Sequence, residues 1–369
     1  MPRYLVHISA DDEERIQRLV ERRAYQSVDH LLSVALRNQL LAEENESNPW
    51  TDSLDFQDFA TTDAKPPSTM GSRKGDSRLA EWDFNAILTM EPPAPLPDPR
   101  EEQIVSQIFW AQYYRFLPLK IASLVLFKMA HERPVPLVDY ARTSVTVATR
   151  VYQRLRALDT KLKLPPGGRL STSFPKPREK SQARFEDQFL ISRRSRNGLL
   201  DGFLARAKFA NLVEVDGELC VGLTRAGAEF VKLPNPVIAN DSAPSRSLSE
   251  QEVNFLVDHL REKVPLEYNH MLAFLDALAG GADSRTTLDA TMKGFYNAVL
   301  KGADRMTNEH VSSMRAGVQS RLQEMGFVAS RRDGRNASCT ITAKGMDLLR
   351  NGTMIGVDLR QDHERLTRD

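Results

Sequence analysis

The chain has 369 residues, 41% of them hydrophobic and 27% charged, and 50 Lys and Arg against 49 Asp and Glu give a net charge of +1. This balance excludes a uniformly basic protein, and two cysteines are too few for a disulfide scaffold or a four-thiolate zinc site. Without a secretory signal or an apolar run near the ~18 residues of a membrane span, we expect a cytoplasmic protein.

Residues 3–9 alternate with period two, so that Tyr4, Val6 and Ile8 share one face of a predicted strand. Two amphipathic helices follow, the first capped by Ser9 and the second by Ser27. One strand and two short helices form too small a core to fold alone. Two copies could pair their strands antiparallel and share a core, which predicts a homodimer.

This pattern resembles the ribbon-helix-helix (Arc/MetJ/CopG-like) family of DNA-binding proteins over residues 1–42. The resemblance implies that two chains form a two-stranded ribbon that enters the major groove of DNA. The strand residues that would read base edges are Arg3, Leu5 and His7. The second helix, beginning at Ser27, would hold a phosphate on its free backbone N–H groups. The alternative is that this module only dimerises.

Residues 43–101 form an acidic, proline-rich stretch that we expect to be a disordered linker, with one short anchor over residues 82–88. It holds 13 acidic and five basic residues, a net charge of −8. A shorter linker is expected at residues 233–249, and a charged tail at 353–369. These breaks delimit two further domains, at residues 102–232 and 250–352.

Both of these domains close with the same pattern, a hairpin followed by a helix. In the first, two strands flank Asp216-Gly217 and a helix begins at Thr224; in the second, they flank Asp333-Gly334 and the helix begins at Thr342. Asp-Gly between alternating segments favours a tight hairpin. The parallel indicates two copies of one architecture.

The first domain also contains a predicted helix-turn-helix, with helices over residues 136–142 and 146–158 and a turn at Thr143-Ser144. Residues 146–196 carry 13 basic and four acidic side chains, a net charge of +9. A basic strip beside such a helix is typical of phosphate binding, although a solvated charged loop is the alternative. The candidate DNA contacts here are Arg150, Gln153, Arg154, Arg193, Arg194 and Arg196.

The second domain resembles the winged-helix domains of MarR-type bacterial regulators. Helices are expected over residues 249–260, 267–278 and 307–324, followed by the hairpin. The resemblance implies DNA contacts from the last helix (Arg315, Gln319 and Arg321) and from the hairpin (Arg331, Arg332 and Arg335). Winged helices also bind proteins, so a protein partner is the alternative.

The expected fold is therefore mainly α with small β-hairpins: a ribbon-helix-helix dimerisation module and two winged helix-turn-helix domains. The seven histidines lack the spacing of metal ligands, and no phosphate loop or nucleophile motif occurs, so we expect neither an enzyme nor a cofactor. The predicted function is sequence-dependent binding of double-stranded DNA at the nucleoid in transcriptional regulation. The alternatives are a plasmid replication, partition or relaxosome accessory protein, and a winged-helix adaptor subunit that binds protein.

Overall fold

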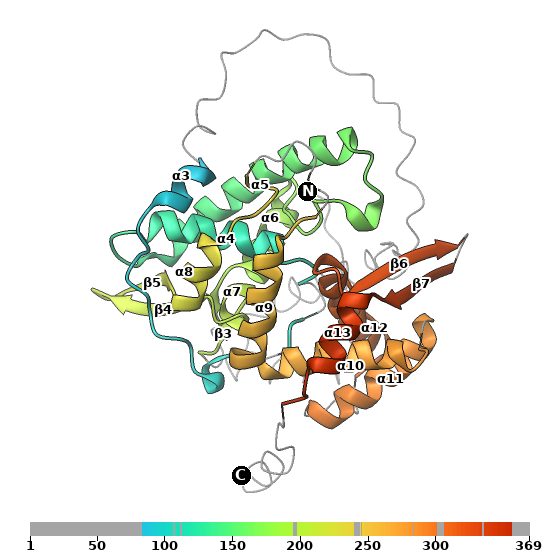
Figure 1. Cartoon of the computed structure of the whole chain (residues 1–369). Coiled ribbons are helices and arrows are strands. Elements are labelled where there is room, and N and C mark those ends of the chain that lie inside the picture. The colour runs from blue at the N-terminus through green and yellow to red at the C-terminus, as the bar shows by residue number, and fades with distance from the viewer. Residues whose placement is uncertain are drawn as a thin grey trace, which may run out of the picture. The chain divides into compact units, whose positions relative to one another are not determined.

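Helices dominate the computed structural model, which is drawn in Figure 1. The structure describes residues 83–105, 108–110, 113–194, 198–239, 244, 246–282, 284–300, 306–333 and 336–355. The proposed ribbon-helix-helix module, with Arg3, Leu5, His7 and Ser27, lies outside the described residues, as do Arg196, Arg335 and the tail beyond residue 355. For Arg331 and Arg332 only the backbone is described.

From residue 117 on, the first half of the described chain combines five α-helices with a three-stranded and a two-stranded antiparallel sheet. Its helices are α4 (Leu117–Met129), α5 (Leu137–Lys161), α6 (Glu179–Phe189), α7 (Phe203–Arg206) and α8 (Arg225–Lys232). The larger sheet has the order β1-β5-β4, formed by β1 (Val135–Pro136), β5 (Glu218–Leu223) and β4 (Ala210–Val215). The smaller one pairs β2 (Ser192–Arg193) with β3 (Leu200–Asp201).

The second half is helical apart from one hairpin. Its helices are α9 (Glu250–Lys263), α10 (Pro265–Ala279), α11 (Arg285–Val299), α12 (Asn308–Glu324) and α13 (Ala343–Asn351). Between the last two, β6 (Val328–Asp333) pairs with β7 (Asn336–Ile341). Ser249 and Thr307 cap α9 and α12, each accepting a backbone hydrogen bond from the first turn, which confirms the helix starts expected at residues 249 and 307.

The two predicted hairpins are confirmed, and they form a structural repeat at an offset of 118 residues. Strand β4 (210–215) corresponds to β6 (328–333), and β5 (218–223) corresponds to β7 (336–341), with the same pairing register. In both, the strand pair leads into a helix capped by a threonine. The hydroxyls of Thr224 and Thr342 accept from Gly227 and Gly345 and donate to the carbonyls of Lys208 and Gly326.

The helix-turn-helix predicted at residues 136–158 is wrong, because α5 is one continuous helix of 25 residues. No glycine or proline interrupts it, so the backbone is free to stay helical through Thr143-Ser144. The hydroxyls of Thr146 and Thr149 donate to the carbonyls of Arg142 and Val145, four residues earlier, and so do not compete with the helix.

Residues 83–101 pack against the first half, whereas only the short anchor at residues 82–88 was expected to do so within the linker. Asp83 caps α3 (Phe84–Thr89), in which Ile87 is buried. Lys232 donates to the carbonyl of Leu88 at 2.6 Å, and the backbone N–H of Leu96 donates to Leu223 at 2.8 Å. These backbone contacts extend the folded part toward the N-terminus by about 20 residues beyond the expected boundary at 101.

The two predicted domains share one core, contrary to the expected division by a linker at 233–249. All described residues belong to one compact unit. Lys120 on α4 lies 3.1 Å from Glu252 on α9, and both side chains are fully buried. The described part of the expected linker is packed as well: Asn235 is buried and donates to Glu252 at 2.8 Å and to the carbonyl of Ser247 at 2.9 Å.

The described residues between 108 and 117 run inside this core and are held by side chains from both halves. Arg206 donates to the carbonyl of Ile108 at 3.1 Å, and Arg321 donates to that of Tyr113 at 2.7 Å. Glu267 accepts from the N–H of Phe109 at 2.9 Å, and Glu324 accepts from that of Phe116. Buried backbone groups need such partners, so this segment ties the two halves together.

Candidate functional site

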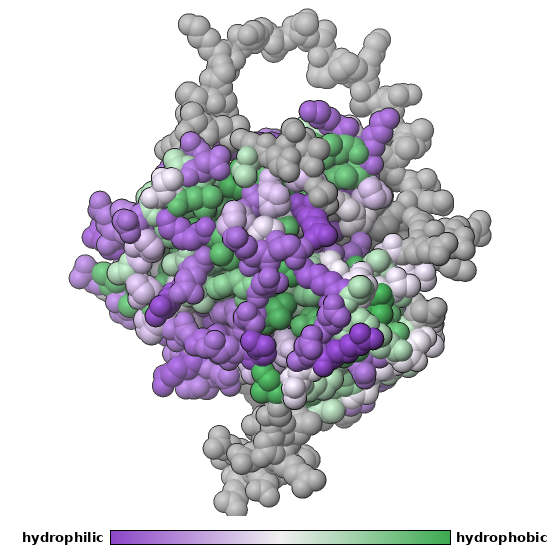
Figure 2. Space-filling model, viewed as in Figure 1, coloured by the Kyte–Doolittle hydropathy of each residue, from purple (hydrophilic) through white to green (hydrophobic). Residues whose placement is uncertain are grey.

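The outer face of α5, with the two residues that follow it, carries an excess of basic side chains. Residues 143–163 contain five basic residues and a single acidic one, Asp159. Four of the basic side chains are exposed and that of Arg150 is half-buried; the exposed ones are Arg154, Arg156, Lys161 and Lys163. Hydrophilic side chains project from the end of this helix at the upper right of Figure 2. This face therefore presents a positive field to solvent.

Asp159 does not neutralise these cations by pairing with them. Its side chain is buried, and it accepts hydrogen bonds from the N–H of Leu170 at 2.7 Å, the N–H of Ser171 at 3.1 Å and the hydroxyl of Ser171 at 2.5 Å. These bonds fasten the loop that follows α5 to the helix. The carboxylate is therefore used to hold this loop in place.

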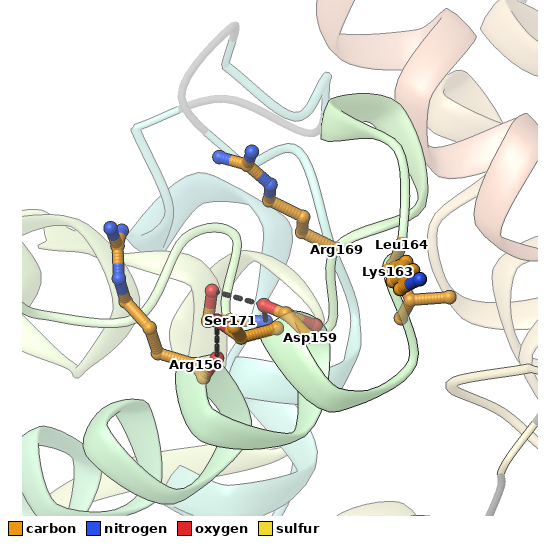
Figure 3. A pocket seen from close by; sticks show the side chains of 7 residues that line it. Arg156, Asp159, Lys163, Leu164, Arg169 and Ser171 are labelled. Carbon is orange, nitrogen blue, oxygen red and sulfur yellow. Dashed lines mark hydrogen bonds between the residues drawn. The ribbon is translucent and has the colours of Figure 1, made fainter. Parts of the chain in front are cut away.

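A pocket of about 280 Å³ opens between the end of α5 and this loop (Figure 3). It combines three cations, one carboxylate, two hydroxyls and one apolar side chain: Arg156, Lys163, Arg169, Asp159, Thr160, Ser171 and Leu164. The cations come from both the helix end and the loop. The pocket is therefore basic and polar.

Two further cations lie beside Arg156, where the chain leads into α6. Partial burial, together with the positive charges of Arg178 and Arg156, lowers the pKa of Lys176 from its usual value. Such mutual repulsion means that these groups are close enough to act on one another. We define the basic surface as Arg150, Arg154, Arg156, Lys161, Lys163, Arg169, Lys176 and Arg178.

The predicted contacts of the first half are only partly brought together. Arg150, Gln153 and Arg154 lie on α5, with Gln153 and Arg154 exposed. Arg193 is exposed on β2, but Arg194 forms an ion pair with Asp201, which also pairs with Arg206. The individual roles of Asp159, Lys163 and Arg169 were missed by sequence reasoning, although the charge of the strip at residues 146–196 pointed to this region.

The expectation that Arg315 and Arg321 face a DNA groove is wrong. Both side chains are buried; Arg315 lies 2.9 Å from Asp289 on α11, and Arg321 lies 2.7 Å from Glu267 on α10. Gln319 is half-buried and accepts a hydrogen bond from Arg315 at 2.7 Å. Helix α12 contacts neighbouring elements on more than one side, so its arginines pair with carboxylates of those neighbours inside the fold.

Glu267 is the centre of a buried polar network. Burial alone would raise its pKa, but attraction by Arg321 and His270 outweighs this effect and holds the pKa below the usual value. His270 lies between Glu267 at 3.2 Å and the hydroxyl of Tyr296 at 2.9 Å. The side chains of Glu267, His270 and Arg321 are fully buried, so we assign the network a structural role.

In the described ranges, no cluster of three or more His, Cys, Asp or Glu side chains is arranged to hold a metal ion. None of the helices there has the length and apolar composition to cross a membrane. Comparison with family models, with curated proteins and with solved structures gave no match to this chain. The basic surface is therefore the feature on which a functional conclusion depends.

Proposed function

We propose that this protein binds double-stranded DNA through the basic surface, as a homodimeric transcriptional regulator. The observation that carries the proposal is the outer face of α5 and the two residues after it, where four exposed cations stand without an exposed carboxylate between residues 143 and 163. A concentrated positive field of this kind attracts phosphates and steers association.

The dimensions of α5 support this choice of partner. Arg150 and Lys161 are separated by ~16 Å along the helix at 1.5 Å per residue. A duplex carries one negative charge per ~1.7 Å of its axis, so an equal length presents about ten phosphates. Exposed cations along α5, such as Arg154 and Lys161, could therefore meet phosphates without competing for the same one.

The proposed DNA contacts of the two halves differ from those that the sequence suggests. With Arg315 and Arg321 buried, we assign DNA contact to the first half and a supporting role to α12. The repeated hairpin with its threonine-capped helix supports the winged-helix resemblance of both halves, and the proposed dimer is attributed to residues 1–42. Sequence preference would come from Gln153 and Arg154, which can hydrogen-bond base edges.

The test is a salt titration of duplex affinity with charge-matched variants. The double variant Arg154→Gln/Lys161→Gln removes two cations of the basic surface. It should flatten the plot of log K against log salt by up to ~1.8, about 0.9 for each phosphate that the protein no longer neutralises. The control, Arg225→Gln/Arg261→Gln, removes two exposed cations from α8 and α9, and should leave the slope unchanged.

Two outcomes would contradict the proposal. One is that both double variants lose affinity equally, which would indicate a diffuse effect of net charge. The other is that the intact protein has no salt-dependent affinity for duplex DNA, a result that would favour the adaptor function. Recruitment of an ATPase to the bound DNA would instead identify plasmid partition as the process served.

A further inference from the structure

The pocket at the end of α5 has the side-chain chemistry of an oxyanion site. Arg156 and Lys163 come from the helix end, Arg169 comes from the loop, and the hydroxyls of Thr160 and Ser171 add hydrogen-bonding groups. Figure 3 shows Asp159 and Ser171 between the points where Arg156 leaves the helix and Arg169 leaves the loop. With Asp159 included, the lining carries three positive charges and one negative charge, a net charge of +2.

Asp159 faces the pocket, yet both of its oxygens are occupied. One accepts from the N–H of Leu170, and the other accepts from the N–H and hydroxyl of Ser171. An arginine at the pocket therefore gains little from turning inward to this carboxylate. Arg156 donates one long hydrogen bond to the hydroxyl of Tyr152, at 3.4 Å, which leaves its other N–H groups for a ligand. A guanidinium matches two oxygens of a phosphate in one plane.

The helix end itself does not require this many cations. The C-terminus of a helix carries a partial charge of about −0.5, and basic residues there often balance it. Here the last carbonyls already accept hydrogen bonds, from Lys163 to Thr160 at 3.2 Å and from Leu164 to Asp159 at 3.0 Å. Three lining cations exceed the charge that the helix end presents.

The loop that forms the far wall is fixed on two sides. Asp159 fastens it to α5, and Arg115 donates to the carbonyl of Gly167, which ties it to the buried segment before α4. Lys163 adopts a left-handed conformation with φ of 50°, which is uncommon for a residue other than glycine. The backbone of the loop is therefore held in position before any ligand arrives, and this reduces the ordering that binding requires.

We propose that this pocket binds one tetrahedral phosphate group. The inference deepens the proposed function and rests on it for the source of the phosphate, which we assign to the DNA backbone. A free phosphate ester has the same chemistry and is the other source to be tested. The volume of about 280 Å³ leaves room for the anion and several waters, since each water occupies ~30 Å³ of liquid volume.

The experiment measures binding of inorganic phosphate to the full chain by ³¹P line broadening, with sodium chloride keeping the ionic strength constant. The intact protein should broaden the signal saturably, and Arg169→Gln should bind phosphate about tenfold more weakly. Arg142→Gln is the matched control, because Arg142 is an exposed arginine on α5 that does not line the pocket. It should bind within twofold of the intact protein.

Absence of saturable broadening, or an equal loss of phosphate affinity in both variants, would overturn the proposal that this pocket binds phosphate. The source is tested by adding a saturating duplex, which should displace inorganic phosphate; phosphate that stays bound beside the duplex would overturn the assignment to the DNA backbone. DNA binding without binding of inorganic phosphate refutes only the proposed phosphate site. Phosphate binding without DNA binding refutes the proposed function alone.

Discussion

Gly227 and Gly345 occupy equivalent positions, 118 residues apart, at the first turns of α8 and α13. A Cβ atom at Gly227 would lie 2.0 Å from the carbonyl oxygen of Phe209, and one at Gly345 would lie 2.2 Å from that of Phe327. No side chain fits at such a distance. The helix therefore approaches the start of its hairpin in the same way in both copies.

Substitution of either glycine by alanine should destabilise the protein, because the backbone must move to relieve the clash. We expect Gly227→Ala and Gly345→Ala each to cost about 1–3 kcal/mol, the usual range for overpacking. Urea unfolding measures this cost. Gly294→Ala in α11 is the control: a Cβ there meets nothing within 4 Å, so it should stabilise by about 0.5–1 kcal/mol.

The ion pair between Arg321 and Glu267 should be costly to break from one side. Arg321→Met would leave the Glu267 carboxylate buried without its strongest partner and the carbonyl of Tyr113 without a donor. Loss of one member of a buried pair costs about 3–5 kcal/mol. The double variant Glu267→Gln/Arg321→Met should lose less unfolding free energy than the two single variants lose together. Additive losses in urea unfolding would show that the two residues are not coupled.

The stability of the protein should depend on pH through His259. Burial lowers the pKa of this histidine, against the effect of its hydrogen bond to the carbonyl of Ala207. Below about pH 6.5 the unfolded chain takes up a proton that the folded state does not, so the free energy of unfolding falls as the pH falls. The contribution is up to ~1.4 kcal/mol per pH unit.

His259→Gln isolates this contribution, since the remaining groups titrate in both proteins. Burial raises the pKa of Glu324, which acts in the opposite direction in acid, so the total slope of the intact protein is a mixture. The difference in unfolding free energy between the two proteins should therefore shrink as the pH falls from 6.5 to 5. A difference that stays constant would exclude His259 as a titrating group.

Asp159→Asn should weaken DNA binding even though it removes a negative charge from a basic surface. An amide cannot accept all the hydrogen bonds that Leu170 and Ser171 donate, so the wall of the pocket should loosen. The free energy of unfolding should fall by about 1–3 kcal/mol. Anisotropy with a labelled duplex measures the affinity. Tighter binding would mean that net charge alone governs the interaction, without a fixed pocket.

The oligomeric state should depend on the N-terminal module. Residues 68–369 form a compact unit separate from residues 1–67, so deletion of residues 1–42 should leave that unit folded. By the ribbon-helix-helix resemblance, the truncated chain should sediment as a monomer and the intact chain as a dimer. A truncated protein that remains a tight dimer would place the interface elsewhere in the chain.

Local features of this fold could be predicted from the sequence, because they depend on neighbours in the chain. The Asp216-Gly217 turn is an example: both residues have positive φ, at 51° and 79°, as a tight hairpin requires. Thr224, Thr307 and Thr342 are likewise recognisable as caps, since the groups they bond lie within three residues.

Features that depend on distant segments could not be predicted. The polar spacing of Arg315 and Arg321 on α12 is the same whether the helix faces solvent or a buried carboxylate, and Glu267 lies 54 residues before Arg321. The continuity of α5 was missed for another reason, since Thr and Ser are neutral enough in a helix for packing to decide. The pocket was missed because Asp159 and Ser171 meet only once the loop is folded back.

The described residues between 108 and 117 also set an order of events during synthesis. Tyr113 and Arg321, which bonds its carbonyl, are 208 residues apart in the chain. A nascent chain that has released only the first half from the ribosome therefore holds backbone groups whose partners have not yet been made. Domains commonly fold as units as they emerge. Here the first half cannot complete its folding until α10 and α12 have been synthesised. A chain that terminates before Arg321 should therefore be a substrate for proteolysis.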